Sequence, residues 1–444
     1  MKASFLIAAP TSGSGKTTVA RGLMNLFTRK GLRVQPFKCG PDYIDTKFHE
    51  RVCHRPSVNL DLFMASPDHV RHLFLQYGKD ADVCVVEGMM GLFDGYDRWQ
   101  GSAYEIAREL GLSVVLVVDA RSAAYSMAPL LYGFTRFRED VRIAGVIYNK
   151  VGSERHAKML RQVCDDLHVD CLGCLPKRQE LEVGDRYLGL DFSSSTDGEH
   201  SEQPAEDVFE KYIDWEKLLQ LSALTPPLTP PLQREGNHSG GLSHVEGDLQ
   251  SPTHVEGDLQ SPTPTSLIAR NAESFSFVYQ ETIDALGSVS FFDPETEVPA
   301  LDNVGLLYLP GGYPEKHAEA LVANEACRRA IRDYALRGGC IVAECGGMMY
   351  LCERILTDEG DYPMCGVLPY TITARKADRR LSLGYRRFLL DGVEYRGHEF
   401  HYSQFLGEVP ASVVQVYDAK GQPVPTPVFR HLNVLASYTH LYPV

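Results

Sequence analysis

Short apolar runs alternate with amphipathic helical patterns in the first part of the chain. After the first run, Val19, Leu23 and Leu26 recur at helical spacing, and Gly31 stands where a helix C-terminal glycine is expected. The apolar runs predict strands at 5–9, 33–39, 83–86, 114–118, 143–148 and 171–175. Strands that alternate with helices predict an α/β fold with a parallel, doubly wound sheet.

The same alternation returns in the last part of the chain. It predicts strands at 267–270, 289–292, 306–309 and 340–343, and helices at 275–286, 316–321 and 326–336. At 444 residues the chain exceeds the size of one ordinary domain. We therefore expect two doubly wound α/β domains, at 1–193 and 266–444.

The stretch between these domains has a different composition. The sequence HVEGDLQSPT at 244–253 recurs unchanged at 254–263, next to proline-rich segments. Such a segment buries too little apolar surface to fold by itself. We interpret 194–265 as a linker that contains one helix at 208–221 and a disordered insert at 222–264.

Composition narrows the classes of partner and the compartment. A formal net charge of −14 argues against nucleic acid and anionic membranes as partners. No apolar run is long enough to span a bilayer, so we expect a cytoplasmic protein. The eleven cysteines suit reduced thiols. Cys171 and Cys174 are spaced like a redox or metal pair, but without a second pair they fit a protein core better.

A glycine loop between the first strand and the first helix has the pattern of a phosphate-binding loop. Lys16 adds a positive charge, and Thr17 offers a hydroxyl to Mg²⁺. Pro10 replaces the first glycine of the usual pattern, and a chance serine-glycine turn is the alternative interpretation. The residues expected to bind the nucleotide here are Gly13, Ser14, Gly15, Lys16, Thr17 and Thr18.

Polar residues follow the ends of several predicted strands, where parallel sheets bind ligands. Asp42 and Asp45 follow the second strand and predict contacts to Mg²⁺ or substrate, with turn capping as the alternative. Glu87 ends an apolar strand, as in a Walker B element, and is expected near the metal. Asp94 is either a loop-stabilising residue or a substrate contact, and Asn149 is either an adenine reader or a turn residue.

A second reactive turn is predicted at Cys345, between a strand and a helix. There the helix N-terminus would lower the thiol pKa and favour a nucleophile over a buried core cysteine. Backbone N–H groups of Gly346 and of the Gly311–Gly312 turn could form an oxyanion hole. Three histidines are candidates for the base, namely His398, His401 and His440.

Seven motifs resemble the cobyrinate a,c-diamide synthase family, and they occur in the family's order from one end of the chain to the other. They are APTSGSGKTT, FKCGPDYID, VVEGMMGLFDG, LPGGYPE, AECGGMMYL, GHEFHYS and SYTHL. The resemblance implies a dethiobiotin-synthetase-like ATP domain joined to a class I glutamine amidotransferase domain. Only the insert at about 222–264 has no counterpart.

The resemblance also implies roles for individual residues. Cys345 would be the nucleophile and His440 its base, and the oxyanion hole expected from the two glycine turns, at Gly312 and Gly346, would lie beside them. Many class I glutaminases have a glutamate two residues after the histidine, and here that position is Tyr442. The implied Mg²⁺ site comprises Thr17, Asp45 and Glu87, and the implied substrate contacts are Asp42, Asp45 and Asp94. We also expect Lys38 to contact the substrate.

A phosphate loop together with a cysteine-histidine pair predicts ATP-driven conversion of a carboxylate into an amide through an acyl phosphate. The expected substrates are ATP, glutamine and a tetrapyrrole polycarboxylate. Cobyrate synthase and nickel-sirohydrochlorin a,c-diamide synthase are related alternatives, and a partitioning-type ATPase switch is the non-enzymatic one. The sequence does not determine the oligomeric state, and a homodimer is one option. A basic cluster fits either a polycarboxylate or a solvated strand; it comprises Arg375, Lys376, Arg379, Arg380, Arg386 and Arg387.

Overall fold

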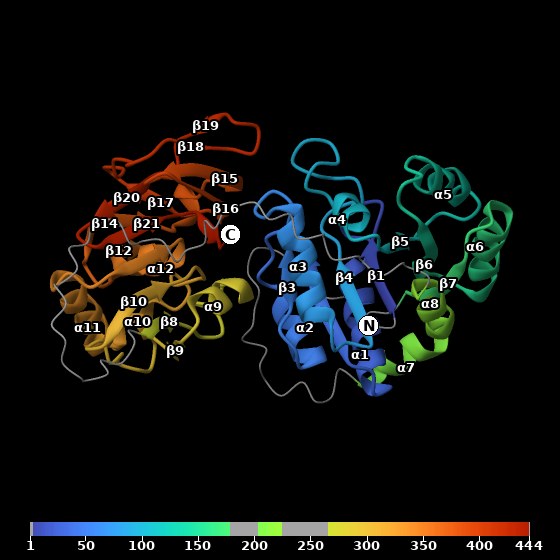
Figure 1. Cartoon of the computed structure of the whole chain (residues 1–444), viewed down its shortest axis with the longest axis horizontal. Helices are drawn as coiled ribbons and strands as arrows, with labels where there is room; N and C mark the ends of the chain where they lie inside the picture. The colour runs from blue at the N-terminus through green and yellow to red at the C-terminus, as the bar shows by residue number, and fades with distance from the viewer. Residues whose placement is uncertain (1–2, 178–202, 224–264, 444) are drawn as a thin grey trace, which may run out of the picture. The chain divides into compact units, whose positions relative to one another are not determined.

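The computed structural model of the chain describes residues 3–177, 203–223 and 265–443 (Figure 1). The chain divides into two compact units, Met1–Glu235 and Gly236–Val444. The repeat and most of the expected linker lie outside the described residues. Within the described residues, no helix is long and apolar enough to cross a membrane.

The first unit is built on a parallel sheet. In its described residues, seven strands lie in the order β3-β2-β4-β1-β5-β6-β7. Their bounds are β1 Ala3–Ala8, β2 Val34–Cys39, β3 Val58–Leu60, β4 Val83–Glu87, β5 Ser113–Asp119, β6 Ile143–Val151 and β7 Cys171–Pro176. Because β1 is central and its neighbours are parallel to it, the loops after β1, β2, β4 and β6 meet at one edge of the sheet.

Helices connect these strands, as the sequence pattern predicts. Their bounds are α1 Lys16–Arg29, α2 Asp45–Cys53, α3 Pro67–Gly78, α4 Ala103–Glu109, α5 Met127–Arg136, α6 Glu154–Leu167, α7 Gln203–Tyr212 and α8 Trp215–Ser222. Gly31 has a φ of 77° and donates its N–H to the carbonyl of Thr28, which ends α1 as expected. Ser66 caps α3 by accepting a hydrogen bond from the N–H of His69.

Helices α7 and α8 belong to the core of the first unit. Phe209 and Ile213 are buried in the same apolar cluster as Phe5 and Leu23. The N–H of Asp214 donates to the carbonyl of Leu172 in β7. The interpretation of 194–265 as a linker is therefore corrected for the described residues 203–223, since their apolar side chains complete a hydrophobic core.

The main sheet of the second unit has the described order β20-β21-β11-β10-β8-β9, in which only the β20–β21 pair is antiparallel. Its strands are β8 Thr265–Ala269, β9 Val289–Phe292, β10 Val304–Leu309, β11 Ile341–Glu344, β20 Val428–His431 and β21 Val434–Ser437. The helices of this unit are α9 Gln280–Leu286, α10 Ala318–Ala323, α11 Glu325–Leu336 and α12 Gly346–Leu351, with a short 3₁₀ turn η3 at Lys376–Asp378.

Two smaller, largely antiparallel sheets complete the second unit, and the sequence pattern did not predict them. One has the order β13-β12-β14-β17, with bounds β12 Cys352–Leu356, β13 Asp361–Pro363, β14 Leu368–Thr373 and β17 Gln404–Leu406. The other has the order β19-β18-β15-β16-β22, with bounds β15 Ser382–Leu390, β16 Val393–His401, β18 Val416–Tyr417, β19 Pro423–Val424 and β22 His440–Tyr442. Strand β22 carries His440 into this second unit's candidate site.

One predicted helix is shorter than expected. Helix α9 begins at Gln280 rather than at 275, because the N–H groups of Ser276 and Phe277 donate to the carbonyl of Gly311. Phe275 and Phe277 are buried. This tertiary contact satisfies the backbone of the segment and removes the need for helical hydrogen bonds.

Candidate functional site

The glycine loop lies between the end of β1 and the start of α1. Gly13 and Gly15 have φ values of 76° and 97°, so the loop uses the left-handed conformations that glycine adopts without strain. The Ser14 hydroxyl donates to the carbonyl of Thr11 at 2.8 Å. Backbone N–H groups in this conformation, at the start of a helix, form an anion-binding cradle.

Asn149, near the end of β6, supports this loop from the second strand along the sheet from β1. Its Nδ2 donates to the carbonyl of Ser14 at 3.0 Å, and its Oδ1 accepts the N–H of Lys150 at 2.9 Å. A Cβ at Gly15 would lie 2.2 Å from Nδ2 of Asn149. The geometry therefore favours a role for Asn149 in holding the phosphate loop over a role in hydrogen bonding to the adenine base.

The loop after β4 packs against the phosphate loop. The ammonium of Lys16 donates to the carbonyl of Met90, and the N–H of Leu92 donates to the carbonyl of Ala9. Asp94 accepts the N–H of Gly91 at 3.0 Å through its Oδ2. Of the two interpretations for Asp94, the loop-stabilising one matches this contact.

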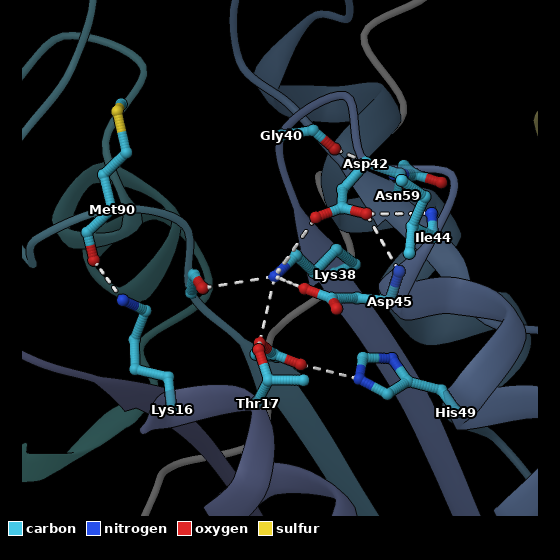
Figure 2. Close-up of polar contacts among 12 residues, drawn as sticks. Lys16, Thr17, Lys38, Gly40, Asp42, Ile44, Asp45, His49, Asn59 and Met90 are labelled. Carbon is cyan, nitrogen blue, oxygen red and sulfur yellow. Dashed lines mark hydrogen bonds and ion pairs between the residues drawn. The ribbon is translucent and has the colours of Figure 1, made fainter. Parts of the chain in front are cut away.

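Lys38, at the end of β2, lies among three carboxylates. Its Nζ is 2.6 Å from Asp45, 3.1 Å from Glu87 and 3.6 Å from Asp42. Figure 2 shows the Lys38 ammonium at the centre of this group, with Asp42 and Asp45 beside it. Lys38, Asp45 and Glu87 are all buried.

Charge pairing determines the protonation of this group. Burial disfavours the charged form of Lys38, but Glu87, Asp45 and Asp42 outweigh burial and raise its pKa above the ordinary value. Burial likewise opposes charge on Glu87, whereas Lys38, His49 and Thr17 hold its pKa well below the usual range. Lys38 and Glu87 are therefore both charged in this group.

His49 of α2 is a site residue that the sequence analysis missed. Its Nε2 is 2.7 Å from Oε2 of Glu87, and its Nδ1 is 3.1 Å from the Ser57 hydroxyl. The other carboxylate oxygen of Glu87 accepts the Thr17 hydroxyl at 2.7 Å. A lone histidine in an amphipathic helix gives no sequence signal for this contact, because Glu87 is far along the chain.

Asp42 has a capping role in addition to its place near Lys38. Its Oδ1 accepts the N–H groups of Ile44 and Asp45, both at 2.9 Å, just before α2 begins (Figure 2). Asn59 donates to the carbonyls of Gly40 and Asp42 and holds the same turn. The turn-capping alternative for Asp42 is therefore part of its observed role.

The oxygen donors of this edge fit a hard cation. The Thr17 hydroxyl and the carboxylates of Asp45 and Glu87 are the ligand types that Mg²⁺ prefers. No group of three or more His, Cys, Asp or Glu side chains that could hold a metal occurs in the described part of the chain. Mg²⁺ takes six oxygen ligands, so the other ligands of a cation held by these three side chains would be phosphate oxygens and water.

In the second unit, Cys345 lies in a strained turn between β11 and α12. Its φ of 45° and ψ of −108° are unusual for a residue other than glycine, and strain of this kind clusters at functional sites. Its N–H donates to the carbonyl of Ser437 at 2.8 Å, three residues before His440. The turn therefore joins the strand of the thiol to the segment of the imidazole.

The thiol pKa is raised, although the sequence predicts that the helix N-terminus lowers it. Burial raises the pKa of Cys345 above its ordinary value, and Glu315 raises it further. The hydrogen bond from the N–H of Gly346 lowers it by less. Helix α12 spans only Gly346–Leu351, so its dipole is small. The resting thiol is protonated, and its reaction requires a base.

His440 and the two glycine turns pack closely together. A Cβ at Gly311 would lie 2.1 Å from Cε1 of His440, and a Cβ at Gly346 would lie 2.9 Å from N of Gly312. Burial lowers the pKa of His440 to about 3, and the neighbouring His398 also lowers it. A neutral imidazole beside the Gly311–Gly312 turn has the protonation state that a base needs.

His401 is engaged elsewhere. Its Nε2 is 2.7 Å from Oε1 of Glu399, and its Nδ1 is 2.8 Å from the carbonyl of Ser403. Its ring stacks on Tyr438 with a centroid separation of 3.6 Å. Because both ring nitrogens have protein partners, the geometry favours His440 over His401 as the base.

The basic cluster of the sequence is not one patch. Arg386 is buried and pairs with Glu399. Burial opposes charge on Glu399, but His401, Arg386 and Thr426 lower its pKa to about 2. Arg375, Lys376, Arg379 and Arg380 are exposed. The Arg386–Glu399 ion pair thus belongs to the packing of β15 against β16. The four exposed residues fit the interpretation as solvated side chains.

Two family models match the chain. The model of the CobQ/CobB/MinD/ParA nucleotide binding domain matches residues 5–188, and that of the CobB/CobQ-like glutamine amidotransferase domain matches residues 270–443. Among solved structures, FtsY of Thermotoga maritima has a TM-score of 0.31 at 14% identity and covers 50% of this chain and 69% of that chain.

Curated relatives match almost the whole chain. The cobyrinate a,c-diamide synthase of Caldanaerobacter subterraneus is 36% identical and covers 98% of this chain and 94% of that protein. The hydrogenobyrinate a,c-diamide synthase of Rhizobium meliloti is 36% identical and covers 98% of each. That of Streptomyces coelicolor is 35% identical and covers 99% of this chain and 94% of that protein. The chain belongs to the family of cobyrinate and hydrogenobyrinate a,c-diamide synthases.

Proposed function

We propose that this protein converts the a- and c-carboxylates of cobyrinate, hydrogenobyrinate or a close tetrapyrrole into amides, with ATP and with ammonia from glutamine. The observation that carries this proposal is the identity of about one third, over 98% of the chain, to relatives named for that reaction. Each unit also contains a candidate site of the required kind. We place its ATP-dependent part at 1–193, extended by the helices at 203–223, and its glutaminase part at 266–444.

The first unit would activate the carboxylate. Backbone N–H groups from Gly13 to Thr18 and the Lys16 ammonium would bind the ATP phosphates. Thr17, Asp45 and Glu87 would hold Mg²⁺, whose charge would stabilise the phosphoryl group during transfer. A carboxylate oxygen of the substrate then bonds to the γ-phosphorus as ADP leaves, which gives an acyl phosphate.

Lys38 is our candidate for binding the substrate carboxylate in this step. Its ammonium already holds carboxylate oxygens of Asp45 and Glu87, so it can exchange one of them for a substrate oxygen. Asp42 would help by capping the turn that follows Lys38 and leads to Asp45, and Asp94 by shaping the loop beside Lys16. We assign Asn149 to the same phosphate loop.

The second unit would release ammonia from glutamine. His440 takes the thiol proton of Cys345 as the sulfur bonds to the amide carbon, and the N–H groups of Gly312 and Gly346 bind the resulting oxyanion. Ammonia leaves with a proton from His440, and water hydrolyses the thioester to glutamate. In the other site, ammonia attacks the acyl phosphate and phosphate leaves, which completes the amide.

The proposed partners are small molecules, and neither nucleic acid nor a membrane is among them. We propose that the protein acts in the cytoplasm, and its oligomeric state, monomer or homodimer, is not part of the proposal. Cobyrate synthase and nickel-sirohydrochlorin a,c-diamide synthase are the neighbouring alternatives, and neither is named among the relatives reported above. A partitioning-type ATPase switch does not account for the glutamine amidotransferase domain at 270–443.

The test is a product analysis with amide-¹⁵N-glutamine. The purified chain is incubated with ATP, Mg²⁺ and either cobyrinate, hydrogenobyrinate or nickel-sirohydrochlorin, and the products are analysed by mass spectrometry and NMR. We expect two ¹⁵N-amides, at the a and c positions of a corrin substrate. Amidation at other positions, or only of the nickel compound, would replace the proposed substrate, and no amidation of any substrate would contradict the proposal.

A further inference from the structure

A buried carboxylate lies next to the candidate base of the second unit. Oε2 of Glu344 is 4.0 Å from Nδ1 of His440, and only 5% and 3% of the two side chains are exposed. Glu344 is the last residue of β11 and immediately precedes Cys345. The end of β11 therefore places the Glu344 carboxylate beside the His440 imidazole, and the Cys345 thiol is on the next residue.

Two hydrogen bonds hold the Glu344 carboxylate in place. The Tyr308 hydroxyl of β10 donates to Oε2 at 2.8 Å, and the N–H of Leu441 donates to Oε1 at 3.1 Å. Leu441 follows His440 in β22, so the carboxylate connects the strand of the thiol with the strand of the imidazole. The close packing of Gly311 against Cε1 of His440 prevents the ring from moving away on that side.

We propose that Glu344 is the positioning residue of the glutaminase site, and that its carboxylate orients the His440 ring and stabilises the imidazolium that forms when Cys345 loses its proton. This inference rests on the glutaminase part of the proposed function. Nδ1 of His440 lies on the side of Glu344, and at 4.0 Å the two groups must move closer to form a hydrogen bond. With its proton on Nδ1, the ring would accept the thiol proton at Nε2 and later give it to the departing ammonia. The carboxylate takes no proton in the cycle.

The position of Glu344 differs from that implied by class I glutaminases, where the glutamate follows the histidine by two residues. Here Tyr442 occupies that position, and its ring packs edge-on against Tyr279 at a centroid separation of 4.9 Å. The charge that stabilises the imidazolium comes instead from the residue before the nucleophile. Glu344 ends β11, and the hydrogen bond that its carboxylate accepts from the N–H of Leu441 ties it to β22, which carries His440.

The titratable groups around this carboxylate permit a pH test. Burial raises the pKa of Glu344 to about 8, whereas its bonds to Tyr308 and Leu441 favour the charged form. The groups that face it are Tyr308 from β10, Cys345 from its own strand end and His440 from β22. The pKa values of Tyr308 and Cys345 are raised and that of His440 is lowered to about 3, so only Glu344 of this set titrates near pH 8.

The experiment measures glutamate release by the full chain carrying Glu344→Gln, Glu344→Asp or Tyr308→Phe. We expect Glu344→Gln to lower kcat about 100-fold and to leave KM within about twofold, because the lost charge acts on the transition state and not on bound glutamine. Glu344→Asp should recover part of kcat. In the wild type, kcat should rise with pH through about 8, and this rise should be absent in Glu344→Gln.

Tyr308→Phe keeps the charge of Glu344 but removes one hydrogen bond to it, so the rise should move to higher pH. This variant also decides the matter if Glu344→Gln does not fold. The proposal would be overturned by an unchanged kcat and pH profile in Glu344→Gln, or by an increase in KM alone. It would also be overturned if Tyr308→Phe did not shift the rise of kcat with pH. Failure of the wild type to amidate any substrate while it still releases glutamate would contradict the proposed function but not this inference.

Discussion

The Thr17 hydroxyl donates a 2.7 Å hydrogen bond to Oε1 of Glu87, a residue 70 positions later in the chain. Thr17 lies in the first turn of α1, and Glu87 is the last residue of β4. The bond joins the phosphate loop to the carboxylate that also contacts Lys38 and His49. It makes Glu87 the link between the nucleotide side and the substrate side of the proposed site.

Replacement of Glu87 by Gln tests this link. The change removes one negative charge with little change in volume, so ATP binding should survive. Mg²⁺-dependent amidation driven by free ammonium should fall by about 10²-fold or more, because the proposed cation loses a charged ligand. The measurement is kcat across a Mg²⁺ titration, with the exposed Glu154→Gln of α6 as the control. An unchanged kcat and Mg²⁺ dependence would remove Glu87 from the site.

Replacement of Cys345 by Ala should separate the two chemistries. Glutamine-driven amidation should fall by about 10³-fold or more, because no other group can form the thioester. Amidation driven by free ammonium should continue, since its residues lie in the first unit. Cys352→Ala, which changes another buried cysteine of the same unit, is the matched control for packing. Loss of ammonium-driven turnover in folded Cys345→Ala protein would refute the scheme of two separate sites.

The two loop glycines should tolerate alanine to different degrees. At Gly15 the new Cβ would lie 2.2 Å from Nδ2 of Asn149, whereas at Gly13 nothing lies within 4 Å. Both positions have positive φ, so each substitution costs about 1–2 kcal/mol in backbone strain, and Gly15→Ala adds a clash. The melting temperature of the ligand-free protein should therefore fall further for Gly15→Ala than for Gly13→Ala. Equal decreases would show that Asn149 does not restrict the loop.

His317 lies 3.0 Å from Glu273 and 3.3 Å from Glu295. These ion pairs should make the stability of the second unit depend on pH. Hydrogen bonding to Glu295 raises the pKa of His317 to about 9; burial opposes the rise and Glu273 supports it. A raised folded-state pKa gives stabilisation that is complete below the unfolded value and is lost as pH rises through about 9. The melting temperature of the wild type should exceed that of His317→Gln by more at about pH 6 than at about pH 10. An equal difference at both values would show that the pairs contribute nothing to folding.

Where residues that are adjacent in the chain form part of a candidate site, that part was predictable from the sequence. A strand, a glycine turn and a helix start occur together at Lys16 and Thr17, so their relative placement depends on local conformation alone. The turn at Cys345 between a strand and a helix is local in the same way, and the structure has it between β11 and α12. The strand-helix alternation likewise predicted the parallel sheet of the first unit.

Contacts between distant residues were decided only by the tertiary structure. Lys38 meets Glu87 because β2 and β4 pair in the register that sets these two residues side by side. Asn149 reaches Ser14, and Glu344 reaches His440, across strands that the sequence does not order. Burial then reversed the prediction for the Cys345 thiol, whose pKa is raised by its surroundings. By itself the sequence determined which local elements carry reactive groups. Sheet order, register and desolvation, which depend on packing between remote segments, decided which groups meet and in what state of charge.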